Sequence, residues 1–208
     1  MPRRSVLLFA GLCLAAAVAL AVTTLVVVNG RDNAATGSQP VSSTGQPSVG
    51  GPFSLVDQDG HPVDQTMLDG KWTLVFFGFT WCPDYCPTTL ATLKATQDRL
   101  GDRADPLQIV FISVDPERDT PGVLKDYLSS DGFPAGVIGL TGTPDQVRAA
   151  ADAYRAYYQK VGEGEGYTMD HSLTVYLMGP DGRFRSALAG DLGPERSAEV
   201  IRRAMARG

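Results

Sequence analysis

The hydrophobic pattern of the 208-residue chain changes character near residues 28 and 50. Residues 6–28 form an apolar run without any charge, and a bilayer-spanning helix needs roughly 20 such residues. Residues 29–50 are rich in Gly, Ser, Thr, Gln and Pro and hold too few apolar side chains to form a core. After residue 50, short apolar runs alternate with segments of helical spacing. The pattern therefore predicts a membrane anchor at 1–28, a flexible linker at 29–50 and a folded domain at 51–208.

The apolar run carries signals for its orientation. Arg3 and Arg4 precede it on its short side, so the positive-inside rule places the N-terminus in the cytoplasm. We expect a single-pass protein of the cell membrane with its C-terminal domain on the extracytoplasmic (periplasmic or outer) face. The length of the run favours an uncut anchor over a cleaved secretory signal, whose apolar core is about 7–15 residues long. Cys13, inside the run, is interpreted as a small apolar residue and not as a lipid attachment site.

The first half of the domain contains apolar strands on either side of one amphipathic segment. Residues 72–79 (WTLVFFGF) and 107–114 (LQIVFISV) are continuous apolar runs, typical of strands buried on both faces. Between them, residues 84–100 have helical spacing, with leucines on one side and Gly101 as a stop signal. In front of them, the segments FSLVD and HPVD flank a QDG turn and predict a short hairpin.

The second half of the domain continues the alternation. Thr-Pro pairs at 120–121 and 143–144 predict two helix starts, because threonine caps a helix and proline fits its first turn. The second of these helices is expected to end near Tyr158. The remaining pattern predicts strands at 137–140, 173–178 and 183–188, and a closing helix at 194–206. This order of elements predicts an α/β, thioredoxin-like fold with an added N-terminal hairpin.

Composition narrows the classes of function. The net charge is −5 and no basic stripe is visible, which argues against nucleic acid as a partner. Of the three cysteines, Cys82 and Cys86 lie in the predicted domain and form an even pair. A domain outside the cytoplasm is where a disulfide can persist.

The segment TWCPDYCPTT places this cysteine pair at a chemically favourable point. Cys82 is expected to open the helix, where the helix dipole stabilises a thiolate and lowers its pKa. Cys86 would then share a helix face with Cys82, with about 5–6 Å between the Cβ atoms. A disulfide needs about 3.8 Å, whereas a metal about 2.3 Å from each sulfur bridges a wider gap. The spacing therefore predicts metal capture, leaves thiol–disulfide chemistry open, and makes an inert stabilising disulfide the less favoured interpretation.

A two-sulfur metal site needs another ligand, and the sequence has two histidines. His61 lies in the QDGH turn and is expected in solvent. His171 is expected at the start of the strand at 173–178, in a loop that faces the cysteine helix of a thioredoxin-like sheet. Asp170 is a candidate acceptor for orienting its ring. Two thiolates and one imidazole suit copper in both oxidation states, and no fourth ligand for structural zinc is evident.

Long stretches of the domain resemble the Sco (SenC) family of copper-binding cytochrome c oxidase assembly proteins: GPFSLVDQDG, FFGFTWCPDYCPTTL, ISVDPERDTPGVLKDYL and MDHSLTVYLMGPDGRF. The resemblance implies a thioredoxin-like fold, an anchored extracytoplasmic domain and one copper ion held by Cys82, Cys86 and His171. It also implies a role in building the dinuclear copper centre of oxidase subunit II. Asp115, in VDPERDTP, matches a family aspartate that is expected to orient the site or a partner, or to cap the turn. Asp84 is expected to add negative charge near the cation or to answer the helix dipole.

Two functions of different class follow from these residues. The first is a membrane-tethered copper metallochaperone for subunit II, with another copper chaperone as a candidate donor. The second is an extracytoplasmic thiol–disulfide reductase that acts on the subunit II cysteines, with Cys82 as the attacking thiolate. A peroxidase of the peroxiredoxin type is disfavoured, because no Thr/Ser-x-x-Cys arrangement is present. His171 separates the first two, since a reductase does not need it.

Overall fold

The structure is a computed structural model that describes residues 49–207. The predicted anchor at 1–28 and all but the end of the predicted linker lie outside the described residues. Within residues 49–207, no helix has the length and apolar character needed to cross a membrane.

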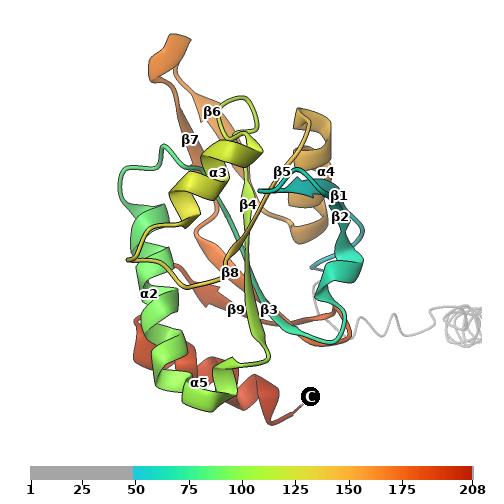
Figure 1. The fold of residues 1–208 in the computed structure, drawn as a ribbon, viewed down its shortest axis with the longest axis vertical. Coiled ribbons are helices and arrows are strands. Elements are labelled where there is room, and N and C mark those ends of the chain that lie inside the picture. The colour runs from blue at the N-terminus through green and yellow to red at the C-terminus, as the bar shows by residue number, and fades with distance from the viewer. Residues whose placement is uncertain (1–48, 208) are drawn as a thin grey trace, which may run out of the picture. The chain divides into compact units, whose positions relative to one another are not determined.

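A seven-stranded sheet with the order β2-β1-β5-β4-β3-β8-β9 forms the centre of the described region (Figure 1). Strands β3, β4 and β5 run parallel, and all other neighbours in the sheet are antiparallel. The pairing of β1 with β2 confirms the predicted front hairpin. The strands of this sheet are β1 (Ser54–Asp57), β2 (Pro62–Asp64), β3 (Trp72–Gly78), β4 (Leu107–Ser113), β5 (Ile138–Thr141), β8 (Thr174–Met178) and β9 (Phe184–Ala189).

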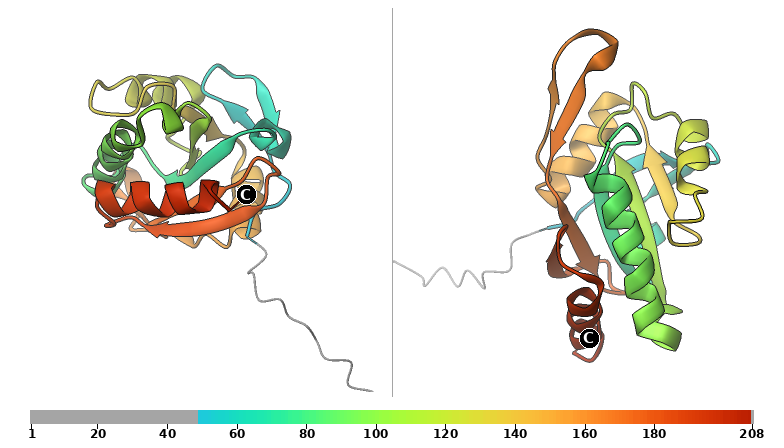
Figure 2. Two further views of the ribbon diagram at one scale, coloured as in Figure 1. Left: turned by 90° about the horizontal axis from the view of Figure 1, so that it is seen from below. Right: turned by 90° about the vertical axis from the view of Figure 1, so that its left-hand side faces the viewer.

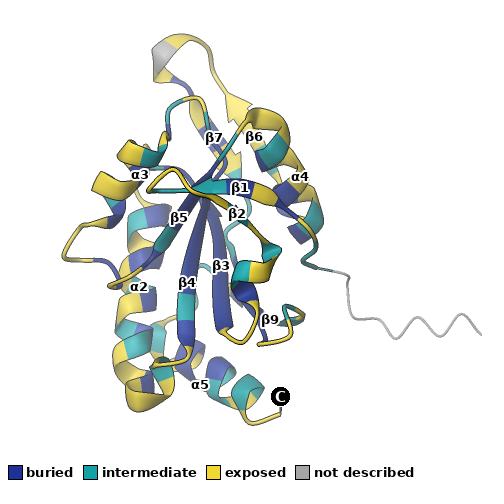
Figure 3. Cartoon of the chain, turned by 45° about the vertical axis from the view of Figure 1, so that its right-hand side comes forward, coloured by how far each residue is buried: buried dark blue, intermediate teal, exposed yellow. Residues whose placement is uncertain are grey.

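The two continuous apolar runs form the core of the sheet. Every residue of β3 is buried, and in β4 only Gln108 is partly exposed (Figure 3). Phe76 and Phe111 are paired in register, and their rings pack edge to face with centroids 5.7 Å apart. Because both strands are covered on both faces, their carboxyl ends are fixed points from which functional loops start.

Helices cover both faces of the sheet. α2 and α3 lie on one face, as right-handed crossovers between parallel strands require, and α4 lies on the other (Figures 1 and 2). α5 packs against α2. The helices are α2 (Tyr85–Leu100), α3 (Pro121–Leu128), α4 (Pro144–Tyr154) and α5 (Pro194–Met205), with short 3-10 turns η1 (Gln65–Leu68), η2 (Gly101–Ala104) and η3 (Gly164–Gly166).

The Thr-Pro pairs start helices as predicted, but one helix ends early. The Thr120 side chain accepts a hydrogen bond from the amide of Val123, and Thr143 forms a capping box with Gln146. α4 ends at Tyr154 and does not continue to Tyr158, so the predicted end was wrong. Arg155 adopts a left-handed conformation with φ of 55°, which stops the helix and reverses the chain.

After this reversal the chain forms a hairpin that the hydrophobic pattern did not predict. β6 (Tyr158–Val161) and β7 (Thr168–His171) pair antiparallel as a separate two-stranded sheet, with Tyr158 opposite His171. In the right-hand view of Figure 2 this hairpin projects beyond the end of the main sheet, away from α5. We call residues 158–171 the histidine arm.

Candidate metal centre

Cys82 lies in the turn between β3 and α2. Its amide donates to the carbonyl of Phe79 at 3.3 Å, and α2 begins only at Tyr85. The prediction that Cys82 opens the helix and shares a helix face with Cys86 is therefore wrong. The half-buried sulfur instead accepts a hydrogen bond from the amide of Cys86, at 3.3 Å. The sulfur thus takes the position of a capping acceptor at the positive end of α2, where a thiolate is stabilised.

Cys86 lies in the first turn of α2 and is fully buried, with 0% of its surface exposed. The absence of a side chain at Gly78 makes room for it, because a Cβ atom built there would lie 2.8 Å from the Cys86 sulfur. Asp84, the residue before the helix, is exposed and makes no side-chain capping bond to the backbone. Its carboxylate accepts a hydrogen bond from the hydroxyl of Thr88 at 3.3 Å.

His171 is the last residue of β7, one strand earlier than the sequence predicted. Its Nε2 atom lies 3.7 Å from the sulfur of Cys86. Its Nδ1 atom lies 3.0 Å from the carbonyl oxygen of Ser172, which takes the orienting role expected of Asp170. The side chain of Asp170 is exposed in β7. The imidazole also packs edge-on against two core rings, those of Phe76 and Phe79.

The three predicted ligands are brought together. The two sulfur atoms and a ring nitrogen of His171 all lie within 4.8 Å of one another. A metal about 2.3 Å from each sulfur and about 2.0 Å from a nitrogen bridges donors at such separations. Two thiolates and one imidazole are soft or intermediate donors, so the set fits copper. His61 lies elsewhere, in the turn after β1, exposed and 3.4 Å from a carboxylate oxygen of Asp57.

The two thiols have opposite acidities. A hydrogen bond from the side chain of Cys86 lowers the pKa of Cys82 to about 4. The contact with His171 lowers this pKa further, while burial opposes the shift. The same hydrogen bond raises the pKa of Cys86, and burial raises it further. In the metal-free state the pair therefore holds one thiolate at Cys82 and one thiol at Cys86.

Asp119 supports the loop that carries Cys82. Its carboxylate accepts hydrogen bonds from the amide of Thr80 at 3.0 Å and from the Thr80 hydroxyl at 2.6 Å. The hydroxyl of Ser113, at the end of β4, donates to it at 2.6 Å. The carboxylate thus ties the ends of the two central strands together, immediately before the cysteine turn. Trp81, between Thr80 and Cys82, is 65% exposed beside this site.

A second buried carboxylate, Asp115, ties the histidine arm to the loop after β4. It accepts hydrogen bonds from the hydroxyl of Tyr167 at 2.6 Å and from Nε of Arg118 at 2.5 Å. Burial and the bond to Asp115 raise the pKa of Tyr167, so its hydroxyl stays protonated and donates. Asp115 therefore contacts Tyr167 of the arm and Arg118 of its own turn, and none of the three candidate ligands. Asp119, Arg118 and Tyr167 were not predicted from the sequence, although the run VDPERDTP contains Arg118 and the two buried aspartates, Asp115 and Asp119.

The fold and the site define a thioredoxin-like protein with a cysteine pair and a histidine at the carboxyl end of its central strands. Comparison with known proteins gives the family: the sequence model described as SCO1/SenC matches residues 41–206, and the chain belongs to this family.

Several relatives are substantially similar. "Protein SCO1 homolog 1, mitochondrial" of Arabidopsis thaliana is 44% identical over 144 residues, which cover 68% of this chain and 42% of that protein. Protein SenC of Rhodobacter capsulatus is 42% identical over 154 residues, covering 74% of this chain and 69% of that protein. The chain spans about half the length, 42–54%, of the plant and yeast relatives that it matches.

Solved structures share the fold. Bradyrhizobium japonicum ScoI with copper bound is 45% identical, with a TM-score of 0.67 over 75% of this chain and 99% of that one. Arabidopsis thaliana ScoI with copper bound has a TM-score of 0.72 at 38% identity, covering 77% and 99%. BsSco, described with a disulfide switch as a member of the Sco family of cytochrome c oxidase assembly proteins, has a TM-score of 0.59 at 27% identity, covering 76% and 94%. The predicted α/β, thioredoxin-like fold is confirmed.

Proposed function

We propose that this protein is a copper metallochaperone that assists assembly of the dinuclear copper centre of cytochrome c oxidase subunit II. In this proposal Cys82, Cys86 and His171 are the copper ligands. The observation that carries it is the convergence of these three donors, within 4.8 Å of one another, from two segments far apart in the sequence. Relatives of the same fold that hold copper support the choice of metal.

The residues of this site suit a metal ion that is bound and then transferred to another protein. Cys82 is already a thiolate, so copper binding has to release only the proton of Cys86. Cys82 is half-buried, which leaves it within reach of an incoming ligand. His171 stands on the histidine arm, outside the main sheet, so one donor is carried by a separate element from the other two.

The anchor and linker complete the proposal. Residues 1–28 would hold the chain in the membrane, and residues 29–50 would let the domain at 51–208 reach subunit II and a donor copper chaperone. Extraction of membranes with alkaline carbonate tests this part. The full chain is expected to stay in the membrane fraction, and a chain that lacks residues 1–28 is expected to be released. Full release of the intact chain would contradict a spanning anchor.

A thiol–disulfide reductase of the subunit II cysteines is the second candidate, because the cysteine pair holds one thiolate and one thiol. The relative described with a disulfide switch also favours it. In this reaction the thiolate of Cys82 attacks a disulfide of the target, and one target sulfur leaves as a thiolate. Cys86 then loses its proton and attacks the sulfur of Cys82. The target leaves as a dithiol, and the Cys82–Cys86 pair is oxidised to a disulfide.

The histidine separates the two candidates experimentally. We expect His171→Ala to weaken copper binding by more than roughly 100-fold, because it removes a direct ligand and even an outer partner is worth 10–100-fold. His61→Ala is the matched control, since it removes the other histidine and leaves the site intact. Copper titration, followed by the sulfur-to-copper charge-transfer absorption, measures both variants. Copper binding by His171→Ala that equals wild type would remove the metallochaperone proposal.

The thiols are tested separately. Cys82→Ser is expected to abolish both copper binding and the reduction of an oxidised target peptide, whereas His171→Ala is expected to keep the reductase reaction. Turnover of the peptide by Cys82→Ser would contradict the redox candidate.

A further inference from the structure

The position of His171 depends on an element that the main sheet does not hold. The histidine arm forms a two-stranded sheet with no ladder to the seven-stranded sheet among residues 49–207. An isolated two-stranded hairpin is at best marginally stable in water. The arm therefore needs contacts of another kind to keep its histidine at the cysteine pair.

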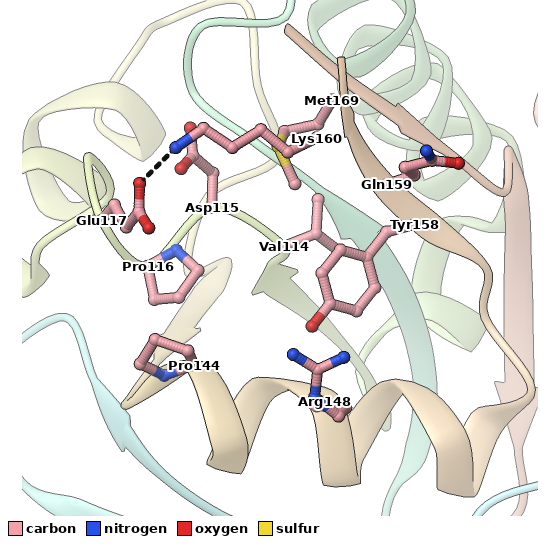
Figure 4. Close-up of a pocket in the computed structure, with 10 residues that line it drawn as sticks. All are labelled: Val114, Asp115, Pro116, Glu117, Pro144, Arg148, Tyr158, Gln159, Lys160 and Met169. Carbon is pink, nitrogen blue, oxygen red and sulfur yellow. Dashed lines mark hydrogen bonds and ion pairs between the residues drawn. The ribbon is translucent and has the colours of Figure 1, made fainter. Parts of the chain in front are cut away.

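Apolar packing holds one side of the arm, where Tyr167 and Met169 are buried in the core of the domain, whereas β6 is mostly exposed. A cavity of about 320 Å³ separates β6 from α4 and from the loop after β4 (Figure 4). Val114 and Met169 form part of its apolar lining, and the side chains of Tyr158 in β6 and Arg148 in α4 point toward each other in it. Polar contacts therefore add to the packing of Tyr167 and Met169 in holding the arm against the domain.

Those contacts centre on Tyr167, just before β7. Its hydroxyl donates to Asp115 at 2.6 Å, and its carbonyl accepts from Nη1 of Arg118 at 3.0 Å. Two cations lie over its ring in cation–π contacts: the guanidinium carbon of Arg118 is 3.6 Å from the ring centroid, and Nζ of Lys160 is 3.8 Å from it. Lys160 in turn pairs with Glu117 at 2.6 Å (Figure 4). One tyrosine thus joins both strands of the arm to the loop that follows β4.

The same contacts reach the cysteine turn. The guanidinium of Arg118 lies 5.4 Å from the ring centroid of Trp81, the neighbour of Cys82. Arg118, in the loop after β4, therefore contacts both the histidine arm and the cysteine turn. Tyr167 is the residue of the arm that it contacts.

We propose that Tyr167 is a positioning residue that holds the histidine arm closed, so that His171 stays beside Cys86. The biological role of this contact rests on the proposed copper function. The position of the arm itself can be measured without any metal. Each opening of the arm would withdraw the imidazole while both thiols stay on the main domain.

Amide hydrogen exchange of the metal-free protein is the first test. Tyr167→Phe keeps the ring and deletes the hydrogen bond to a buried carboxylate, so exchange in residues 168–171 is expected to rise roughly 10- to 100-fold. Tyr158→Phe is the control on the same arm, because the Tyr158 hydroxyl makes no hydrogen bond within residues 49–207 and the ring is retained. Unchanged exchange in Tyr167→Phe, or an equal rise in the control, would overturn the proposal.

Copper release to a competing chelator is the second test. Tyr167→Phe is expected to speed release by about the same factor as the exchange, because the histidine leaves whenever the arm opens. In a His171→Ala background the tyrosine substitution is expected to change nothing. Equal acceleration in both backgrounds would show a general structural effect and overturn the positioning role. A wild type that holds no copper would overturn the proposed function instead, and the exchange comparison would still decide the role of Tyr167.

Discussion

Gly78→Ala tests how tightly the cysteine pair is packed against the central strands. A methyl group at residue 78 would lie 2.8 Å from the Cys86 sulfur and 2.8 Å from Cε2 of Phe111, both of which are fully buried. Carbon contacts are most favourable at about 3.5–4.0 Å, so each neighbour would have to move by roughly 0.7 Å. Neither can move into solvent, because the ring packs against Phe76 of β3 and Tyr127 of α3 and the Cys86 side chain is fully buried.

The cost follows from this overlap. Overpacking of a core by one methyl group costs about 1–3 kcal/mol. The alanine also lowers the conformational entropy of the unfolded chain, which offsets about 0.4–1 kcal/mol of this cost. We therefore expect the free energy of unfolding to fall by roughly 1–2 kcal/mol, which lowers the Tm by about 2–8 °C for a domain of this size. The displaced sulfur is also expected to weaken copper binding, since the ligand set loses its geometry.

Urea unfolding followed by circular dichroism measures the stability, and copper titration measures the site. Gly122→Ala is the matched control, because Gly122 lies in the first turn of α3 and an added Cβ has no atom within 4 Å apart from its chain neighbours and the backbone of its own helix. There, the same substitution is expected to leave stability unchanged or to raise it by up to about 1 kcal/mol. If Gly78→Ala unfolds at the same urea midpoint as wild type, the close packing of Cys86 is not a constraint.

Further predictions concern the thiolate and two buried groups. Alkylation of metal-free Cys82 by iodoacetamide is expected to be nearly as fast at pH 6 as at pH 8, because its lowered pKa keeps it a thiolate across this range. A fall of roughly 75-fold, as for a thiol of pKa about 8.5, would contradict this. Asp119→Ala removes the acceptor for Thr80 and Ser113 and should cost about 2–4 kcal/mol in urea unfolding, whereas unchanged stability would refute the bracing role. Tyr154→Phe should stabilise by about 1 kcal/mol, because its buried hydroxyl has no hydrogen-bond partner within the described chain. A thermal melt with a lower Tm would contradict this.

The main sheet could be predicted from the sequence because its signals are local. The apolar runs that form β3 and β4 are long and continuous, and the Thr-Pro pairs mark helix starts whatever surrounds them. The histidine arm was missed because its strands are short and mostly exposed. In the sequence, residues 168–171 (TMDH) contain a single apolar side chain, Met169, between polar ones. The run was too short to separate from a loop.

The residues of the candidate site were predicted correctly by type, but the secondary-structure elements that carry two of them were predicted wrongly. Cys82 and His171 were both placed in the wrong element, yet they meet Cys86 as expected. The chemistry of a sulfur pair and a histidine is recognisable without exact placement. The contacts that hold the arm could not be predicted, because the bond from Tyr167 to Asp115 joins residues 52 positions apart and no pattern along the chain indicates it.

The two tryptophans of the chain stand at opposite ends of β3, and this makes the molecule its own optical probe. Trp72 is buried where the strand begins, whereas Trp81 is exposed just past its other end, roughly 20 Å away by strand length. Indole emission is sensitive to solvent and is quenched at short range by Cu(II). Red-shifted light from the outer indole should therefore dim as the ion arrives, while the blue emission of the inner indole remains as an internal standard.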